Sequence, residues 1–134
     1  MVVKKAGCIL IDKKAKKIGI VYRQNRDDYS FPKGHLDDDE SLVECAIRET
    51  KEETGRICEI VSENIYIEKY ITSSGENVEM YYYIAVDKGN YDNTNDDSHD
   101  LVWVDFDNVE DILSYPNLKL TWSNIRAKVL EFLN

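Results

Sequence analysis

Three glutamates and an arginine lie close together in the segment LVECAIRETKEETG, residues 42–55. In a helix, Glu49, Glu52 and Glu53 would lie within about one turn of one another, where their charges repel unless cations are bound. Carboxylate oxygens are the ligands that Mg²⁺ prefers, and Mn²⁺ accepts the same donors. Arg48 precedes Glu52 by four residues and can hydrogen-bond it. The spacing therefore predicts a divalent-cation site.

The helix that would carry these acids has a recognisable start. Ser41 is the expected N-cap and Glu44, three residues later, completes a capping box, so we expect a helix from about Leu42 to Thr54. Its expected core-facing residues are Leu42, Val43, Ala46, Ile47 and Thr50. A glutamate-rich helix face is often merely solvated. The preceding loop, residues 31–34, changes the interpretation because its Pro-Lys-Gly turn can aim a backbone carbonyl at the acids.

The loop and helix together resemble the signature of the Nudix hydrolases. The pattern G-x5-E-x7-R-E-x-x-E-E-x-G is matched over residues 34–55 by Gly34, Glu40, Arg48, Glu49, Glu52, Glu53 and Gly55. The family has apolar residues where this chain has Thr50 and Arg56. We interpret both differences as packing variations, because neither position carries chemistry.

The resemblance implies an activity and a set of ligands. Nudix hydrolases attack a phosphoanhydride bond of a nucleoside diphosphate linked to another group, with water as the nucleophile. Glu49, Glu52 and Glu53 would hold Mg²⁺ together with the carbonyl of Lys33 or Gly34, and one of the three glutamates would accept a proton. The sequence does not separate the base from the ligands. A further acid from a later loop is expected from among Asp96, Asp97 and Asp100.

A smaller motif within the signature favours a particular substrate class. Residues 32–35, PKGH, resemble the corresponding segment of diadenosine tetraphosphate hydrolases, which implies phosphate contacts from Lys33 and His35. An aromatic residue aligned with Tyr82 stacks on adenine in those enzymes. The chain departs from them at Val78, where they commonly have a lysine. Alternatively, His35 is a surface turn residue and Tyr82 packs in a core.

Several other functions stay open at this level. The alternatives are removal of pyrophosphate from an RNA 5′ end, hydrolysis of a diphosphoinositol polyphosphate, sanitising of oxidised nucleoside triphosphates, and nucleotide binding without turnover. A net charge of −9 disfavours extended nucleic-acid or membrane contacts, and 17 basic residues against 26 acidic ones disfavour a ligand as phosphate-rich as a diphosphoinositol. A small nucleotide polyphosphate is the preferred substrate class, and the oligomeric state is unknown.

Length and composition indicate one globular domain, residues 1–134, in which 43% of the residues are hydrophobic. The chain has neither an apolar run of membrane-spanning length nor a signal-peptide pattern, so we expect a cytoplasmic protein. Three cysteines without a CxxC spacing are expected to be buried thiols.

The remaining pattern predicts the order of strands and helices. Expected strands cover residues 6–11, 18–23, 57–61, 65–72, 78–86 and 101–106, and expected helices cover 109–113 and 122–133 in addition to 42–54. The first two strands, joined by DKKAKK, are expected to form a hairpin. Strands on both sides of a helix favour a mixed sheet between helical layers. The family resemblance makes this an α/β/α sandwich.

Overall fold

A computed structural model describes residues 1–91 and 99–134 of the chain. The described residues form one eight-stranded sheet with the order β3-β2-β1-β7-β5, in which β4 pairs with β1, β6 with β7 and β8 with β2. The strands are β1 (Val2–Asp12), β2 (Lys17–Arg23), β3 (Asp28–Ser30), β4 (Lys33–His35), β5 (Arg56–Ile60), β6 (Tyr66–Ile71), β7 (Asn77–Asn90) and β8 (His99–Asp105). The helices are α1 (Leu42–Thr54), α2 (Val109–Ile112) and α3 (Pro116–Leu133), with a 3₁₀ turn (Phe106–Asn108) before α2.

The centre of the sheet is a parallel pair of long strands. β1 pairs with β7 from Val2 opposite Asn77 to Ile11 opposite Val86, whereas β1 pairs with β2 and β4 in the antiparallel sense. Residues 6–11 of β1 are all buried, which is typical of a strand covered on both faces. The sheet is therefore mixed, as predicted.

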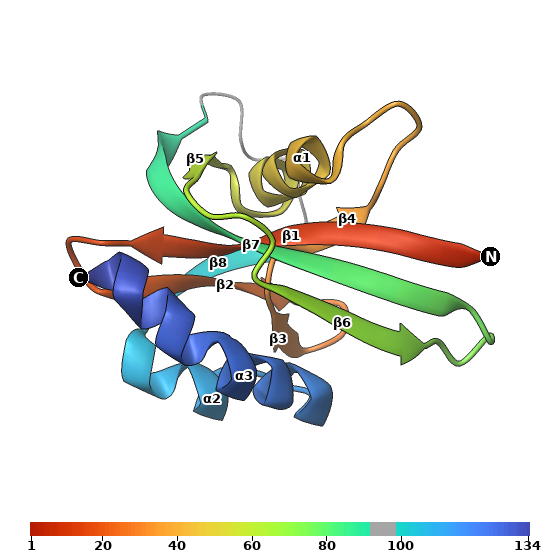
Figure 1. Ribbon diagram of the computed structural model, residues 1–134. Helices are drawn as coiled ribbons and strands as arrows, with labels where there is room; N and C mark the ends of the chain where they lie inside the picture. The colour runs from red at the N-terminus through yellow and green to blue at the C-terminus, as the bar shows by residue number, and fades with distance from the viewer. Residues whose placement is uncertain (92–98) are drawn as a thin grey trace.

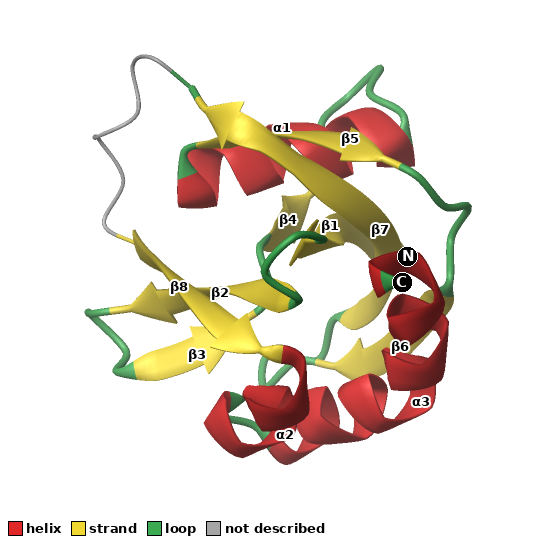
Figure 2. Cartoon of the chain, turned by 90° about the vertical axis from the view of Figure 1, so that its left-hand side faces the viewer, coloured by secondary structure: helices red, strands yellow, loops and turns green. Residues whose placement is uncertain are grey.

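Helices cover both faces of this sheet. Figure 1 shows α1 on one side and α2 with α3 on the other, and the same three layers are visible after the rotation in Figure 2. The buried side chains form two clusters, one with α3 that includes Tyr82 and Trp122, and one with α1 that includes Cys8 and Tyr83. Neighbouring residues of β7 thus belong to different layers. The predicted α/β/α sandwich is confirmed.

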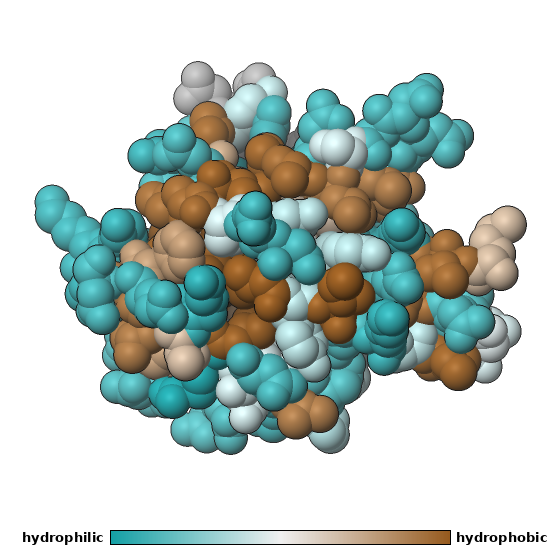
Figure 3. Space-filling view, viewed as in Figure 1, coloured by the Kyte–Doolittle hydropathy of each residue, from teal (hydrophilic) through white to brown (hydrophobic). Residues whose placement is uncertain are grey.

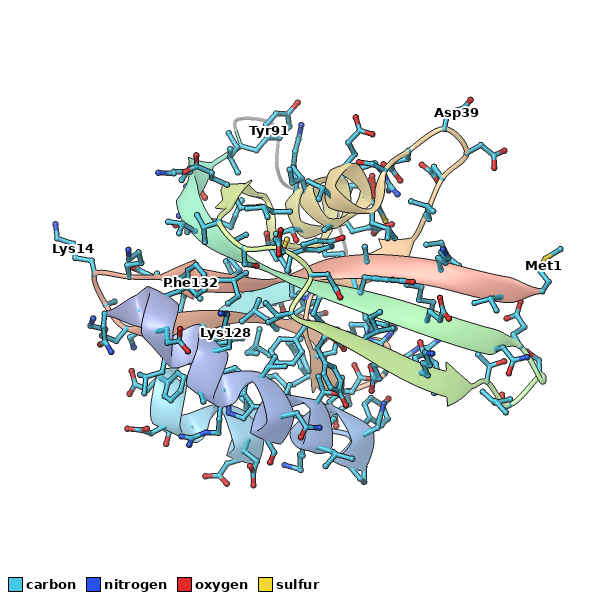
Figure 4. The ribbon with its side chains drawn as sticks, in the orientation of Figure 1. Met1, Lys14, Asp39, Tyr91, Lys128 and Phe132 are labelled. Atoms are coloured by element: carbon cyan, nitrogen blue, oxygen red, sulfur yellow. The ribbon has the colours of Figure 1, made fainter. Side chains whose placement is uncertain are left out.

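The predicted hairpin at the start of the chain is also confirmed. Leu10 of β1 lies opposite Gly19 of β2. In the connecting turn, the carboxylate of Asp12 accepts hydrogen bonds of 3.1 Å from the backbone N–H groups of both Lys14 and Ala15. Figure 4 shows the side chain of Lys14 pointing away from the molecule at the tip of this turn.

Five elements differ clearly from the sequence-based expectation. β3 was not expected as a strand, and β1 begins at Val2, four residues before the predicted start. Residues 33–35, expected as a loop, form β4, because the turn lies against β1 with Gly34 opposite Ala6. β7 continues to Asn90, beyond the predicted end at residue 86, because Arg56 of β5 pairs with Asn90 there. α3 begins at Pro116, six residues before the predicted start, because proline is well accommodated in a first helical turn.

The surface and the cysteines agree with an ordinary globular domain. On the face seen in Figure 3, hydrophobic side chains lie in separate groups between hydrophilic ones. Cys8, Cys45 and Cys58 are buried free thiols, as predicted. None of the helices in residues 1–91 and 99–134 has the length and apolar composition needed to cross a membrane.

Candidate active site

The helix α1 has the boundaries that the capping pattern predicts. Ser41 Oγ accepts a hydrogen bond of 3.1 Å from the N–H of Glu44, and the Glu44 carboxylate accepts one of 2.9 Å from the N–H of Ser41. At the other end, Gly55 has φ 70° and donates its N–H to the carbonyl of Lys51. A glycine is favoured there because the left-handed conformation strains other residues. Both ends of the helix are thereby fixed.

Gly34 of β4 lies directly against the carboxyl group of Glu49 on α1. A Cβ atom built on Gly34 would lie 2.0 Å from Glu49 Cδ and 2.1 Å from Oε2. Because β4 pairs with β1 beneath α1, Gly34 is held where only a hydrogen atom fits. The glycine of the sequence pattern therefore forms a cradle for the Glu49 carboxyl group.

Glu53 of α1 binds β4 at Lys33, the residue before Gly34. Its Oε1 accepts a hydrogen bond of 3.1 Å from the backbone N–H of Lys33. Burial raises the pKa of Glu53 to about 7, although the Lys33 hydrogen bond acts in the opposite direction. Burial also raises the pKa of Glu49. The two carboxyl groups thus lie side by side on Lys33 and Gly34, in surroundings that disfavour their negative charge unless a cation is present.

Arg48 organises the neighbouring acids. Its guanidinium donates two hydrogen bonds to Glu40, from Nε at 2.7 Å and from Nη2 at 3.0 Å, and its Nη1 donates to Glu49 at 3.0 Å. The predicted bond to Glu52 is present at 3.2 Å, and the carbonyl of His35 accepts another at 3.0 Å. Arg48 holds the pKa of Glu40 down at about 2. The main partner of the arginine is therefore Glu40 rather than Glu52.

The oxygen donors fit a divalent cation that is completed by substrate. No group of three or more His, Cys, Asp or Glu side chains within the described residues is arranged as a cation site by itself. Glu49 and Glu53 supply two carboxyl groups over the Gly34 cradle, while the Glu52 side chain is 56% exposed. Mg²⁺ is often bound through one or two carboxylates, waters and substrate phosphates. The residues fit such a centre, with Glu52 at its outer edge.

Lys33 and His35 flank the Gly34 cradle on β4. The side chain of Lys33 is partly buried and lines a cavity on the side of the sheet that α3 covers. Burial lowers its pKa, and the nearby charge of Glu53 acts in the opposite direction. His35 is exposed and pairs through its backbone with Lys5 of β1. The backbone of both residues thus lies next to Gly34, and their phosphate contacts stay a prediction.

Tyr82 lies elsewhere than predicted. Its side chain is fully buried, its hydroxyl donates a hydrogen bond of 3.0 Å to Glu68, and its ring meets Phe31 edge-on with the centroids 5.9 Å apart. A ring in this position has no free face for a nucleobase. The interpretation of Tyr82 as a stacking platform is therefore corrected, because its side chain packs in the hydrophobic core between the sheet and α3.

Sequence reasoning missed an ion pair at the edge of the site. Arg23 of β2 donates from Nε at 2.7 Å to Asp28 of β3, which is buried, and the Tyr115 hydroxyl also donates to Asp28. The Arg23 charge acts against the burial that raises the pKa of Glu53. The register that places Arg23 opposite Asp28 depends on β3. Only the pairing of an arginine with an aspartate five residues later could have hinted at it.

The predicted late-loop acids are only partly placed. Asp96 and Asp97 lie outside the described residues. Asp100 is on β8, where its carboxylate accepts a hydrogen bond of 2.7 Å from Gln24. Its side chain is thus engaged at the β2–β8 edge of the sheet.

The chain resembles a known family, curated proteins and solved structures. Residues 1–131 match the family described as "NUDIX domain". An 8-oxo-(d)GTP phosphatase of Mycolicibacterium smegmatis is 32% identical over 75% of this chain and 31% of its own length. The m7GpppN-mRNA hydrolase of Saccharomyces cerevisiae is 28% identical over 84% of this chain and 12% of its own length, so the chain spans less than a third of either relative. The structure of the C. elegans Ap4A hydrolase is 25% identical, covers 96% of this chain and 99% of that one, and has a TM-score of 0.75.

Proposed function

The chain belongs to the Nudix family, and from this premise we propose that it is a Mg²⁺-dependent hydrolase of a phosphoanhydride bond in a nucleoside diphosphate-linked substrate. The observation that carries the proposal is the pairing of the Glu49 and Glu53 carboxyl groups over Gly34 and Lys33. A binding module without turnover would not need two half-buried carboxyl groups with raised pKa values. The arrangement therefore favours catalysis over binding without turnover.

Several residues of this chain would contribute to the attack of water on phosphorus. When bound, Mg²⁺ would neutralise charge on the phosphate oxygens and make the attacking water more acidic. Glu49, Glu53 and the carbonyl of Lys33 or Gly34 would hold it. Arg48 keeps Glu49 in position, and the Lys33 N–H does the same for Glu53. One carboxylate of the pair takes the proton from the attacking water, the new P–O bond forms, and the bridging P–O bond breaks.

The residues next to Gly34 on β4 support a substrate class. Lys33 and His35 precede and follow Gly34 on β4. The Lys33 side chain, which lines the adjoining cavity, and the exposed His35 are proposed to contact phosphates next to the scissile bond. The solved relative with the stated 25% identity is an Ap4A hydrolase. We therefore infer that dinucleoside polyphosphates, diadenosine tetraphosphate among them, are the first class to test.

A second candidate substrate contains guanine. The two curated relatives carry names that specify 8-oxo-(d)GTP and m7GpppN-mRNA as substrates. The net charge of −9 opposes a long RNA contact, but a phosphorylated or capped 5′ end needs only a local site. Guanosine triphosphate and a 5′-triphosphorylated RNA therefore belong in the test. A diphosphoinositol polyphosphate serves as the electrostatically disfavoured comparison.

The test is a hydrolysis assay with this substrate panel and Mg²⁺. We expect a dinucleoside tetraphosphate to be split unequally into a nucleoside triphosphate and a monophosphate. Glu49→Gln should lower kcat by about a hundredfold or more, because one charged donor of the centre is lost. The matched control is Glu110→Gln, which removes an exposed carboxylate of α2. Binding of the panel without any turnover would instead support the binding-module alternative.

A further inference from the structure

A polar cavity adjoins the proposed active site on the side of the sheet that α3 covers. It has a volume of about 200 Å³, and its walls include Lys33 of β4, Glu68 and Tyr70 of β6, and Tyr115 and Asn117 at the start of α3. Pockets for whole ligands usually measure about 300–1,000 Å³. The cavity is thus suited to one part of a ligand. Figure 1 shows the first turns of α3 next to β3 and β6.

The most unusual group in its wall is the Glu68 carboxyl. Glu68 is only 7% exposed. Its Oε1 accepts a hydrogen bond of 3.0 Å from the Tyr82 hydroxyl, and its Oε2 accepts one of 2.8 Å from Asn117 Nδ2. Each carboxylate oxygen can accept two hydrogen bonds, so each keeps capacity for a ligand. Two neutral donors could be satisfied by a neutral side chain at lower cost, because a buried carboxylate is expensive.

The other walls provide flat surface and further polar groups. The amide of Asn117 uses one N–H for Glu68, which leaves its second N–H and its carbonyl for a ligand. The Tyr115 side chain is 40% exposed, and its hydroxyl is held by the buried Asp28. The ring is therefore fixed beside the cavity. Tyr70 adds a second, partly buried ring.

Lys33 connects the cavity to the carboxyl pair. Its side chain lines the cavity while its backbone N–H binds Glu53. Glu68 lines the same cavity, so Lys33 lies between the Glu68 carboxyl group and the carboxyl pair at Gly34. A nucleotide whose phosphates lie at the Gly34 cradle could therefore reach this cavity with its base.

We infer that this cavity receives the nucleobase and that Glu68 makes the site prefer guanine to adenine, an inference that rests on the proposed function. The Watson–Crick edge of guanine carries two adjacent donors, N1–H and the 2-amino group, which match the two free acceptor positions of a carboxylate. Adenine presents the N1 lone pair at the corresponding place, and an acceptor that faces a carboxylate is repelled. A site built to bind a donor discriminates strongly against a ligand that lacks it.

The test is the affinity for three monophosphates, GMP, IMP and AMP, measured by calorimetry with Mg²⁺ present. These ligands contain no phosphoanhydride bond, so binding is measured separately from hydrolysis. We expect wild-type protein to bind GMP at least about tenfold more tightly than AMP, with IMP between them because it keeps N1–H and lacks the 2-amino group. Equal affinities for GMP and AMP, or no binding of any of the three at millimolar concentration, would overturn the inference.

The variant that tests the assigned residue is Glu68→Gln. Glutamine can still accept from Tyr82 but replaces the second acceptor by a donor, so the preference for GMP should fall to about threefold or less. Glu59→Gln is the matched control, because Glu59 lies on β5 with its side chain 64% exposed, and it should keep the wild-type preference. An unchanged preference in folded Glu68→Gln would refute the role of Glu68. If Glu68→Gln does not fold, the affinities of wild-type protein for GMP and IMP still test whether the site recognises the 2-amino group of guanine.

Hydrolysis of diguanosine and diadenosine tetraphosphate separates this inference from the proposed function. A preference for GMP in binding, without cleavage of either compound or of GTP, would support the base site and contradict the hydrolase. Cleavage of both compounds with equal kcat/KM would support the hydrolase and contradict the guanine preference.

Discussion

Replacement of Glu53 by glutamine should stabilise the metal-free protein at alkaline pH while it removes activity. Burial raises the pKa of Glu53 from 4.5 to about 7. A carboxyl group whose pKa is higher in the folded state favours folding while it is protonated, and this contribution is lost as the pH rises through the folded-state pKa. Wild-type protein should therefore lose stability between about pH 4.5 and 8.5, and Glu53→Gln should not show this part of the loss.

The expected size follows from the pKa difference. At about 1.4 kcal/mol for each pKa unit, a rise from 4.5 to about 7 corresponds to about 3 kcal/mol at pH 8.5. The glutamine carbonyl can accept the hydrogen bond from the Lys33 N–H, so the variant should lose little in exchange. We expect Glu53→Gln to gain up to about 3 kcal/mol relative to wild type at pH 8.5 and close to nothing at pH 4.5.

Urea unfolding in the presence of EDTA measures this difference at the two pH values. Glu52→Gln is the matched control, since the Glu52 side chain is 56% exposed on the same helix and should change stability by less than about 1 kcal/mol at either pH. In the hydrolysis assay, Glu53→Gln should lower kcat by about a hundredfold or more. A stability difference that is the same at pH 4.5 and 8.5 would refute the reasoning, and near-wild-type turnover would remove Glu53 from the site.

Three further substitutions test other parts of the structure. Gly34→Ala should lower kcat by about a hundredfold while the fold persists, because the new Cβ would lie 2.0 Å from Glu49 Cδ, and retained turnover would contradict the cradle. Wild-type protein should lose thermal stability below about pH 4, because Arg23 holds the pKa of Asp28 below 3.8 and this stabilisation disappears as the carboxylate is protonated. Asp28→Asn should reduce this dependence of the unfolding temperature on pH, which thermal unfolding from pH 3 to 7 measures. The same dependence in the variant as in wild type would count against the ion pair. Tyr82→Ala should lower the free energy of unfolding by about 3–5 kcal/mol, as loss of a buried aromatic does. A raised KM with unchanged stability in denaturant unfolding would restore Tyr82 to the substrate site.

The parts that sequence could predict are those determined within a few residues. The capping box of Ser41 and Glu44 and the glycine at position 55 define α1, and the structure gives α1 the predicted boundaries Leu42–Thr54. The hydrophobic pattern likewise predicts the hairpin of β1 and β2 and the short helix near Val109. Each of these depends on local hydrogen bonds or on one periodicity, which a single sequence contains.

The parts that sequence could not predict depend on partners far along the chain. The loop at Gly34 becomes a strand because β1 offers a free edge, and no residue in the loop specifies that pairing. Alternation along β7 places Tyr82 opposite to Tyr83, but it does not say which face carries the larger core beneath α3. The Arg23–Asp28 pair requires the register of two short strands.

For the candidate site itself, the sequence identified the acidic residues but not which of them contact β4 and which is exposed. Spacing placed three glutamates together, whereas the structure holds Glu49 and Glu53 against β4 and leaves Glu52 mostly exposed beside Arg48. The motif residue Glu40 had no assigned role, and its bidentate pairing with Arg48 supplies one.

The most direct test of the central proposal is hydrolysis of a dinucleoside tetraphosphate in ¹⁸O-labelled water with Mg²⁺, followed by mass analysis of the products. The proposed water attack on phosphorus predicts one ¹⁸O atom in the phosphate of a single product, a requirement for Mg²⁺, and at least about a hundredfold lower turnover for Glu49→Gln. Turnover that persists in EDTA, or in the Glu49→Gln variant at the wild-type rate, would contradict the assignment of the carboxyl pair at Gly34 as the catalytic centre.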